Sequence, residues 1–484
     1  MISDTEPCDL TAVEAARLVR ERHITAVELV ESCLRRIERV NGTVNAIVTL
    51  VADQALAEAA KADADLAAGH LRGPLHGLPV AHKDLVDTAG IRTTYGSRLY
   101  EEHVPDRDAV IVRRMRAAGA ITVGKTNTPE FGTGSHTVNA VFGATRNPYD
   151  TARSAGGSSG GAAAALATGM VPLADGSDMG GSLRNPASFC NVTGLRPTPG
   201  LVPSPATGTA AWYTLGVSGP MARTVGDLAL LLGVIAGFDH SSPLTLPGDG
   251  SEFTALSNAL SSSLSHALSA PDGLTGLRVA WSPDLGGLPV DPDTAAITAR
   301  APAVFERLGA RVERVDLDLS AADDAFRIYR AWYYTLAYGE LPQSELAENV
   351  RWNVTAGRAL TAADLARAER LRTGLFRRMS AFWANYDLLI APVSQVPPFP
   401  VEEPHVAVVA GVPMPDYLAW MRSAYWISVL HAPAASVPCG FTPDGLPVGV
   451  QLVGRPYGDA GVLRAAAAFE AATGHAARRP PLLG

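Results

Sequence analysis

The chain has 484 residues, of which 47% are hydrophobic and 18% charged, which is ample apolar material for a core and unlike a disordered chain. A formal net charge of −8 with no run of lysine and arginine argues against a nucleic-acid binder. We find no secretory signal and no uncharged apolar stretch of about twenty residues, so we expect a cytoplasmic protein without a membrane span. The four cysteines are far apart and form no CxxC, which argues against a zinc site or a disulfide framework.

The first part of the chain is predicted to be helical and to carry no chemistry. Residues 9–40 form two helices by their apolar spacing, and Thr25 followed by Glu28 is the pattern of a capping box that opens the second one. An alanine-rich helix is predicted over 53–68. We assign residues 1–70 to packing.

Two lysines follow the short apolar strands predicted next. Lys83 lies just beyond a strand at 78–81, and Lys125 follows a strand at 120–123. A lysine whose ammonium is costly to bury can act as a neutral amine and accept a proton. Either lysine could take that role, and the local sequence does not choose between them.

Residues 156–186 are the segment around which the chain is organised. They hold two serines, Ser158 and Ser182, each surrounded by glycine and separated by an alanine-rich run and a short apolar strand. Glycine gathers in this way where the backbone approaches another group closely or takes a positive φ. We interpret the segment as the working part of a serine hydrolase.

The rest of the chain alternates strands with helices, which predicts an α/β fold with a mostly parallel or mixed sheet. A buried helix is expected within 219–237, and residues 238–275 are predicted to be irregular because they are rich in Ser, Pro and Gly. A helical region at 361–384 then leads into an apolar strand within 387–394. No internal repeat or strong linker divides the chain.

The residues themselves leave two interpretations of the serines open. Residues 156–160 match G-x-S-x-G, the nucleophile elbow of α/β-hydrolases, which would make Ser158 the nucleophile of an esterase with a later histidine as base. The elbow needs a strong strand directly before it, but the preceding residues are polar and interrupted by proline. The alternative makes Ser182 the nucleophile and Ser158 its relay, with a lysine as base and glycine N–H groups facing the developing negative charge.

Three ordered motifs resemble those of the amidase signature family, hydrolases that use a Ser–cis-Ser–Lys triad. They are GLPVAHKD (77–84), GGSSGG (156–161) and DMGGSLRNPA (178–187). The spacing also matches, because 75 residues separate Lys83 from Ser158 and 24 separate Ser158 from Ser182. The resemblance covers nearly the whole chain and favours Lys83 over Lys125 as the base.

The resemblance implies a role for each matching residue. Ser182 attacks the carbonyl carbon. Ser158, after a cis peptide bond at Gly157, relays the proton to the leaving nitrogen, and Lys83 drives this relay as a neutral base. The oxyanion hole is expected from the backbone N–H groups of Met179, Gly180, Gly181 and Ser182. The supporting residues are Ser159, which hydrogen-bonds around Lys83, and Asp178 and Arg184, which serve as scaffold.

The resemblance also implies one large α/β/α domain over residues 1–484, with a mixed central sheet of roughly eleven strands. We divide it into N-terminal helices (1–70), a catalytic core (71–237 and 385–484) and a variable region (238–384) that shapes the substrate pocket. No metal or organic cofactor is implied, and we expect a small-molecule amide substrate with no nucleic-acid or membrane partner. A homodimer is left open.

Two residues depart from the family pattern. His82 stands where an aliphatic residue is usual, and on a strand its side chain points away from that of Lys83, so we predict a satisfied packing histidine rather than a second base. Ser177 replaces the threonine that is common before Asp178, a mild change that we expect to alter no role.

Aromatic residues in the variable parts are the predicted walls of the acyl pocket, namely Trp212, Tyr213, Tyr329, Trp332, Tyr333 and Tyr425. As a group they favour an apolar or aromatic substrate such as an aryl amide, an anilide or a carbamate. The rival within the family is the glutaminase subunit of the tRNA-dependent amidotransferase, which usually carries an Asp and an Asn where this chain has Met421 and Ser428. That difference argues against glutamine recognition.

Overall fold

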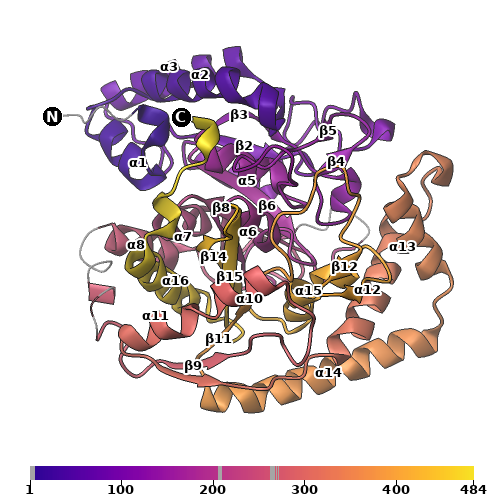
Figure 1. Ribbon diagram of the computed structural model, residues 1–484. Coiled ribbons are helices and arrows are strands. Elements are labelled where there is room, and N and C mark those ends of the chain that lie inside the picture. The colour runs from indigo at the N-terminus through magenta and orange to yellow at the C-terminus, as the bar shows by residue number, and fades with distance from the viewer. Residues whose placement is uncertain (1–5, 205–209, 262–266, 269, 271, 484) are drawn as a thin grey trace.

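A single mixed sheet forms the centre of the molecule (Figure 1). The computed structural model describes residues 6–204, 210–261, 267–268, 270 and 272–483. Within them the strands of the sheet are β1 (Ile47–Leu50), β2 (Pro79–Lys83), β3 (Ile121–Thr126), β6 (Leu173–Asp178), β7 (Thr193–Arg196), β8 (Val217–Ala222), β9 (Arg278–Trp281), β10 (Arg311–Arg314), β11 (Leu388–Pro392), β14 (Ala434–Phe441) and β15 (Pro447–Gly454). Two short hairpins lie apart from it, β4 (Val138–Asn139) with β5 (Gly143–Ala144), and β12 (Val408–Val409) with β13 (Val412–Pro413).

The spatial order of the strands is β1-β3-β2-β6-β8-β7-β14-β15-β11-β9-β10, which makes an 11-stranded sheet of the described residues. β2 is parallel to both of its neighbours, β3 and β6, and β9 is parallel to β10 and β11. The remaining pairs, from β6 through to β11, are antiparallel, as is the pair of β1 with β3. The mixed sheet of roughly eleven strands predicted from the sequence is confirmed.

Helices cover both faces of the sheet. They are α1 (Ala12–Arg20), α2 (Ala26–Val44), α3 (Ala52–Ala67), α4 (Val110–Ala117), α5 (Gly160–Ala167), α6 (Arg184–Phe189), α7 (Val225–Ile235), α8 (Ser251–Leu260), α10 (Pro292–Thr298), α11 (Ala301–Arg307), α12 (Ala321–Tyr338), α13 (Glu348–Arg358), α14 (Ala362–Asn385), α15 (Arg422–Val429) and α16 (Asp459–Thr473). α1, α7, α8, α11 and α16 pack on one face, while α5, α6, α12, α14 and α15 pack on the other. The result is an α/β/α sandwich.

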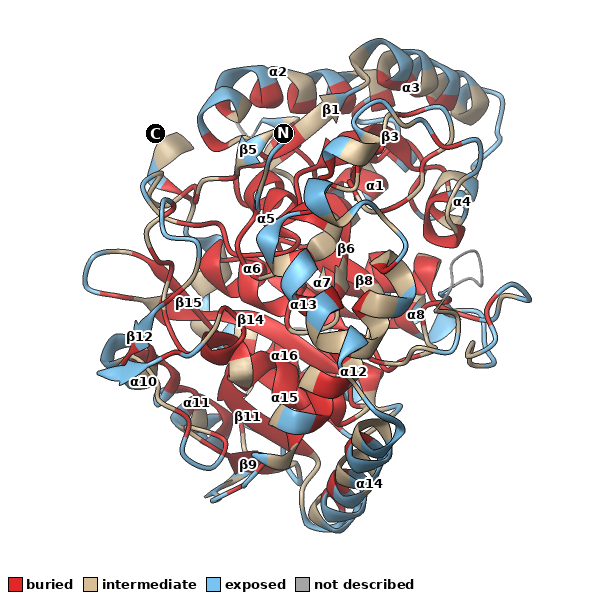
Figure 2. Cartoon of the chain, turned by 90° about the vertical axis from the view of Figure 1, so that its right-hand side faces the viewer, coloured by how far each residue is buried: buried red, intermediate tan, exposed pale blue. Residues whose placement is uncertain are grey.

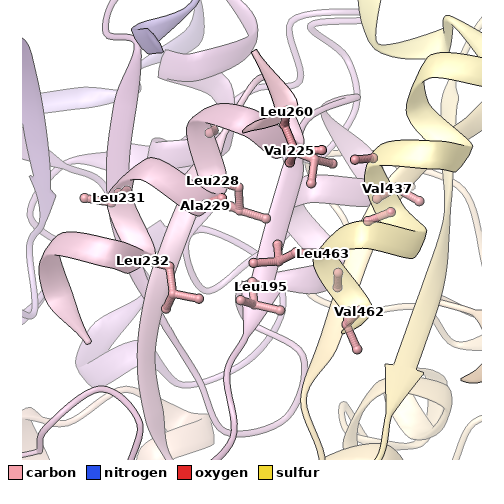
Figure 3. Close-up of a cluster of buried hydrophobic side chains, with 14 of the residues drawn as sticks. Leu195, Val225, Leu228, Ala229, Leu231, Leu232, Leu260, Val437, Val462 and Leu463 are labelled. Carbon is pink, nitrogen blue, oxygen red and sulfur yellow. The ribbon is translucent and has the colours of Figure 1, made fainter. Parts of the chain in front are cut away.

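Successive side chains of the central strands point to opposite faces of the sheet and so pack into both helical layers. In β15, Val450 and Leu452 pack toward α7 and α16, whereas Val453 packs toward α15. Figure 3 shows the first of these layers, where Leu195 of β7 and Val437 of β14 meet leucines and valines of α7 and α16. Because both faces are covered, β15 is buried along its whole length and β14 at all positions but its last, as the red ribbon in Figure 2 shows.

The predicted elements are found with one clear error. The capping box is present, since Glu28 N–H donates to Thr25 Oγ1 at 3.0 Å and Thr25 N–H to Glu28 Oε2 at 2.8 Å. The expectation of an irregular segment at 238–275 is wrong where α8 forms, because Phe253 and other apolar residues at helical spacing pack against α7. Positions 262–266, 269 and 271 of that segment lie outside the described residues. α13 was not predicted.

The outermost helices are amphipathic, and α2, α3 and α14 present exposed outer faces in Figure 2. In the part of the chain that the structure describes, no helix combines the length and the hydropathy needed to cross a membrane.

Candidate active site

Lys83 is the last residue of β2, beside the parallel strand β6, so that both strands deliver their carboxyl ends to one edge of the sheet. Its side chain is fully buried. Nζ lies 2.7 Å from Ser158 Oγ, 3.0 Å from Ser159 Oγ and 3.1 Å from Ser177 Oγ. The lysine therefore contacts three hydroxyl groups, including that of Ser177, a contact that was not predicted from the sequence.

Burial changes the proton affinity of this amine. Desolvation lowers the pKa of Lys83 to about 7, against the opposing influence of the Asp175 and Asp178 carboxylates. Near neutral pH a large fraction of the lysine is therefore an uncharged amine, the form that accepts a proton from a neighbouring hydroxyl group.

Asp175 fixes the position of the lysine from the neighbouring strand. Its Oδ1 accepts a hydrogen bond from the backbone N–H of Lys83 at 3.0 Å, and its Oδ2 lies 2.5 Å from His82 Nδ1. His82 Nε2 lies 3.2 Å from Thr122 Oγ1, so both ring nitrogens of this fully buried histidine have partners. The packing role predicted for His82 agrees with these contacts.

Lys125 occupies a different environment. Its Nζ donates to the carbonyl oxygen of Val86 and to the hydroxyls of Thr88 at 2.8 Å and Thr93 at 3.0 Å. Burial also lowers the pKa of Lys125, to about 8. Its partners belong to the loop that follows β2, so this lysine holds that loop and contacts neither motif serine among the described residues.

Ser158 follows a cis peptide bond at Gly157, as the resemblance implied. The carbonyl oxygen of Gly157 accepts a hydrogen bond from Ser135 Oγ at 2.7 Å, and that of Gly156 accepts one from Thr137 Oγ1 at 2.8 Å. These two hydroxyl residues come from a separate loop. Nothing in the sequence distinguished Ser135 and Thr137 from other polar residues.

Glycine is required at two positions around the serines. Gly156 has φ +74°, and an added Cβ would lie 2.9 Å from the backbone of Pro186. Gly181 has φ +115°, and an added Cβ would lie 2.6 Å from the Ala424 methyl group. Both positions combine a left-handed backbone with a close contact, which explains why the motifs carry glycine there.

Ser182 lies in the turn between β6 and α6 and is partly exposed. Its carbonyl oxygen accepts a hydrogen bond from Ser159 N–H at 3.3 Å. Across the described ranges its hydroxyl group has no hydrogen-bond partner, and it lines the same cavity as Ser158 and Ser177. The hydroxyl of Ser182 is thus free to react with a bound molecule.

The Asp178 carboxylate holds the turn that carries Ser182. Its Oδ1 accepts from Gly181 N–H at 2.9 Å and its Oδ2 from Leu183 N–H at 3.2 Å. The prediction that Gly181 N–H serves the oxyanion hole is therefore corrected, because this donor is already bonded to a carboxylate. The N–H groups of Met179, Gly180 and Ser182 have no acceptor in the described part of the protein and remain available for an oxyanion.

Two buried arginines neutralise Asp178. Arg184 Nε donates to its Oδ2 at 3.0 Å, and Arg196 lies 3.4 Å from its Oδ1. Although burial acts in the opposite direction, these guanidinium groups lower the pKa of Asp178 to about 2. Arg184 also donates to Gln451 Oε1 at 2.9 Å and to Ser428 Oγ at 2.8 Å, which connects the turn to β15 and α15. The scaffold role predicted for Asp178 and Arg184 agrees with this network.

Replacing Asp178 with asparagine is expected to destabilise the fold by about 3 kcal/mol or more, because two buried guanidinium groups lose their carboxylate. Urea denaturation measures the difference. The control is Asp324→Asn, which removes a half-exposed ion pair with Arg367 and should cost about 1 kcal/mol or less. Equal costs for the two variants would contradict the stabilising role of the buried network.

A cavity of about 710 Å³ opens above the serines. Its wall contains Ser158, Ser177 and Ser182 together with Met179 and Gly180 of the turn. The aromatic residues that line it are Tyr95, Tyr100, Phe131, Tyr213, Phe326, Tyr333, Tyr334 and Tyr338. Rings, several with phenol hydroxyls, therefore form a large part of the wall beyond the reactive edge, beside small residues such as Ala210, Ala211 and Gly216.

Of the six predicted wall residues, Tyr213 and Tyr333 line the cavity, with ring centroids 4.5 Å apart. The other four predictions are corrected. Trp212 is 73% exposed, and Tyr425 stacks behind Phe326 at 4.3 Å. Tyr329 bonds Glu369 of α14, and Trp332 packs against Tyr213 from outside the cavity.

Helical geometry explains the correction in α12. Its cavity-lining positions are Phe326, Arg330, Tyr333, Tyr334, Ala337 and Tyr338, which form one stripe at a spacing of three to four residues. Tyr329 and Trp332 lie off that stripe. Composition alone identified the aromatic segment but not the face that it presents.

Comparison with known proteins matches the family described as Amidase over residues 28–463. The acylamidase of Rhodococcus erythropolis is 36% identical, over 97% of each chain. A subunit of the glutamyl-tRNA(Gln) amidotransferase of Moorella thermoacetica is 38% identical, over 98% of each chain. The crystal structure of a bacterial aryl acylamidase belonging to the amidase signature enzymes has a TM-score of 0.86 at 29% identity, and the match covers 97% of this chain and 99% of that one.

The chain therefore belongs to the amidase signature family. It is an amidohydrolase, a hydrolase that acts on amide C–N bonds. The α/β/α fold expected from the motifs is the fold of the family.

Proposed function

We propose that this chain is a free-standing amidase that cleaves a small aryl or apolar amide through an acyl-enzyme on Ser182. The observation that carries the proposal is the contact of the buried Lys83 amine with the Ser158 hydroxyl, at the floor of the cavity that Ser182 lines. This arrangement supplies a base, a relay and a nucleophile without a histidine.

In the first half of the reaction Ser182 Oγ attacks the carbonyl carbon of the amide. Its proton passes to Ser158 Oγ, whose own proton passes to the neutral amine of Lys83. The carbonyl oxygen gains negative charge and is stabilised by the unpaired N–H groups of the turn, those of Met179, Gly180 and Ser182. The tetrahedral intermediate then collapses as the C–N bond breaks.

The leaving nitrogen takes a proton from Ser158 Oγ, and Lys83 returns its proton to Ser158. The amine departs, and the acyl group stays on Ser182 as an ester. A water molecule then attacks that ester, with Ser158 and Lys83 again accepting and returning the proton. The products are a carboxylic acid and an amine.

The ring-lined cavity supports an aromatic or apolar substrate. Anilides, aryl amides and carbamates each place a carbonyl beside a leaving nitrogen, and some esters would also react. One wall comes from α12, which lies within the variable region 238–384, and this agrees with our proposal that the region shapes the pocket. The similarity to an acylamidase points the same way.

The glutaminase alternative has the support of sequence identity but less support from the cavity. Met421 lines the cavity at the position where that branch usually carries a carboxylate. Ser428 is buried and accepts a hydrogen bond from Arg184, so it is committed to the scaffold. We therefore favour an enzyme that acts without a second protein.

A cytoplasmic location is also part of the proposal. The proposal is compatible with either a monomer or a homodimer. The four cysteines are buried and free, which suits a reducing compartment.

A fluorophosphonate label followed by peptide mapping tests the nucleophile, and hydrolysis of acetanilide by the purified chain tests the activity. We expect the label on Ser182 and turnover without any added protein. A label on Ser158 would instead support the α/β-hydrolase elbow. Labelling of Ser182 with no turnover of any aryl amide, anilide or carbamate would favour a partner-dependent enzyme.

A further inference from the structure

Arg330 is a buried cation in the cavity wall that has no carboxylate partner among the residues that the structure describes. Its side chain is only 4% exposed, and it lines the cavity from α12. Nε donates to Asn353 Oδ1 at 3.1 Å, and Nη2 donates to the phenol oxygens of Tyr334 at 2.9 Å and Tyr417 at 3.0 Å. Among the described residues all of these partners are neutral.

The remaining guanidinium nitrogen faces a poor acceptor. Nη1 of Arg330 lies 3.2 Å from the sulfur of Met179, and the phenol hydroxyl of Tyr213 lies 3.7 Å from the same sulfur. A thioether accepts hydrogen bonds weakly, and one N–H of Nη1 has no acceptor at all in the described structure. Two good donors therefore converge beside one weak acceptor, and all three residues line the cavity.

The contrast with Arg327, one helical turn earlier, is informative. Arg327 contacts the carboxylates of Asp323 at 3.0 Å and Asp416 at 2.7 Å and does not line the cavity. Within the described residues Arg330 has only its hydrogen bonds to neutral groups and its ring contacts to offset desolvation, the nearest ring being the face of Tyr334 at 4.6 Å. A buried charge without an opposite charge is unfavourable, so an anion that enters the cavity would complete this site.

We infer that Arg330 and Tyr213 form a subsite for a carboxylate carried by the substrate. The preferred substrate on this view is an amide with an apolar or aromatic body and a carboxylate group. The Met179 side chain would yield to a carboxylate oxygen, which accepts a charge-assisted hydrogen bond from the guanidinium far better than a thioether does. The inference rests on the proposed amidase function, because the subsite and Ser182 share one cavity.

Matched substrate pairs test the subsite on the wild-type enzyme. One series compares the p-nitroanilides of dicarboxylic acids, from succinyl to adipoyl, with the isosteric methyl ketones. A second series places the group on the leaving amine and compares acetylated 4-aminobenzoate with acetylated 4-aminoacetophenone. We expect kcat/KM to favour the carboxylate by about tenfold or more in at least one series, mainly through a lower KM.

Variants then assign the preference to its residues. Arg330→Met should reduce the carboxylate-to-ketone ratio to about unity, and Tyr213→Phe, which removes one hydroxyl group, should reduce it partly. Arg327→Met is the matched control, because it removes an arginine of the same helix outside the cavity, and it should keep the wild-type ratio. The ratio is independent of the amount of folded protein, so a purely structural role for Arg330 would not change it.

The inference is overturned if the wild-type enzyme shows no carboxylate preference in either series, or if the preference survives in Arg330→Met. If Arg330→Met does not fold, the ratios measured on the wild-type enzyme and on Tyr213→Phe still test the subsite.

A binding measurement distinguishes a failure of this inference from a failure of the proposed function. The Tm of Ser182→Ala should rise more with the p-nitroanilide that carries a free carboxylate than with the isosteric methyl ketone. This result is expected whether or not Ser182 is the nucleophile.

Discussion

Replacing Ser182 with alanine is expected to lower kcat/KM for an aryl amide by about 10⁴-fold or more. The acyl-enzyme cannot form without its oxygen, and loss of a hydrolase nucleophile has effects of this size. Steady-state hydrolysis of a p-nitroanilide, followed by release of nitroaniline, measures the change. The same variant should not react with a fluorophosphonate.

The fold of this variant should be unaffected, because the Ser182 hydroxyl has no hydrogen bond within the described residues and the contact with Ser159 uses its carbonyl oxygen. Ser188→Ala is the matched control. Ser188 lies on α6 outside the cavity and accepts a hydrogen bond from Gly449 N–H at 2.7 Å, so its loss should change Tm more than activity. Substantial turnover by Ser182→Ala would show that another residue is the nucleophile.

Replacing Lys83 with methionine is expected to lower kcat/KM by about 10³-fold, because Ser158 loses the amine that takes its proton. Methionine keeps most of the side-chain volume in this fully buried position. In the wild-type enzyme the active form is the neutral amine, so kcat/KM should fall about tenfold per pH unit below a pKa near 7 and level off above it.

A pH series with an uncharged anilide measures both effects. The acid limb should disappear from the residual activity of Lys83→Met, because the group that titrates is gone. A profile that is flat between about pH 5 and pH 8 in the wild-type enzyme, or an acid limb that survives in the variant, would contradict the assignment of Lys83 as the base.

The three residues that we propose as the triad could be singled out from the sequence because each lies in a short motif with unusual neighbours. Their supports could not all be found in that way. Ser135 and Thr137 bond the backbone around the cis peptide from a distant loop, and such hydroxyl residues are common anywhere in a chain. Asp175 did carry a signal, since a charged residue inside a buried strand needs partners, which turn out to be His82 and the backbone of Lys83.

The pocket was harder to predict because its walls come from side-chain directions rather than from composition. The aromatic segment of α12 was identified, yet only its helical stripe reaches the cavity, and Arg330 within that stripe was overlooked. An arginine four residues before Tyr334, on a helix rich in aromatic residues, was the available signal. The bond from Gly181 to Asp178 depends on the turn itself and had no signal in the sequence.

The network behind the nucleophile has a consequence for biosynthesis. Arg184, in the turn motif, is held by Ser428, 244 residues later, and by Gln451, 267 residues later. The reactive turn therefore gains its full set of partners only after nearly all of the polypeptide has left the ribosome. A nascent chain that already contains all three proposed triad residues should therefore have no hydrolytic activity. The reactive serine would act only in the completely synthesised enzyme.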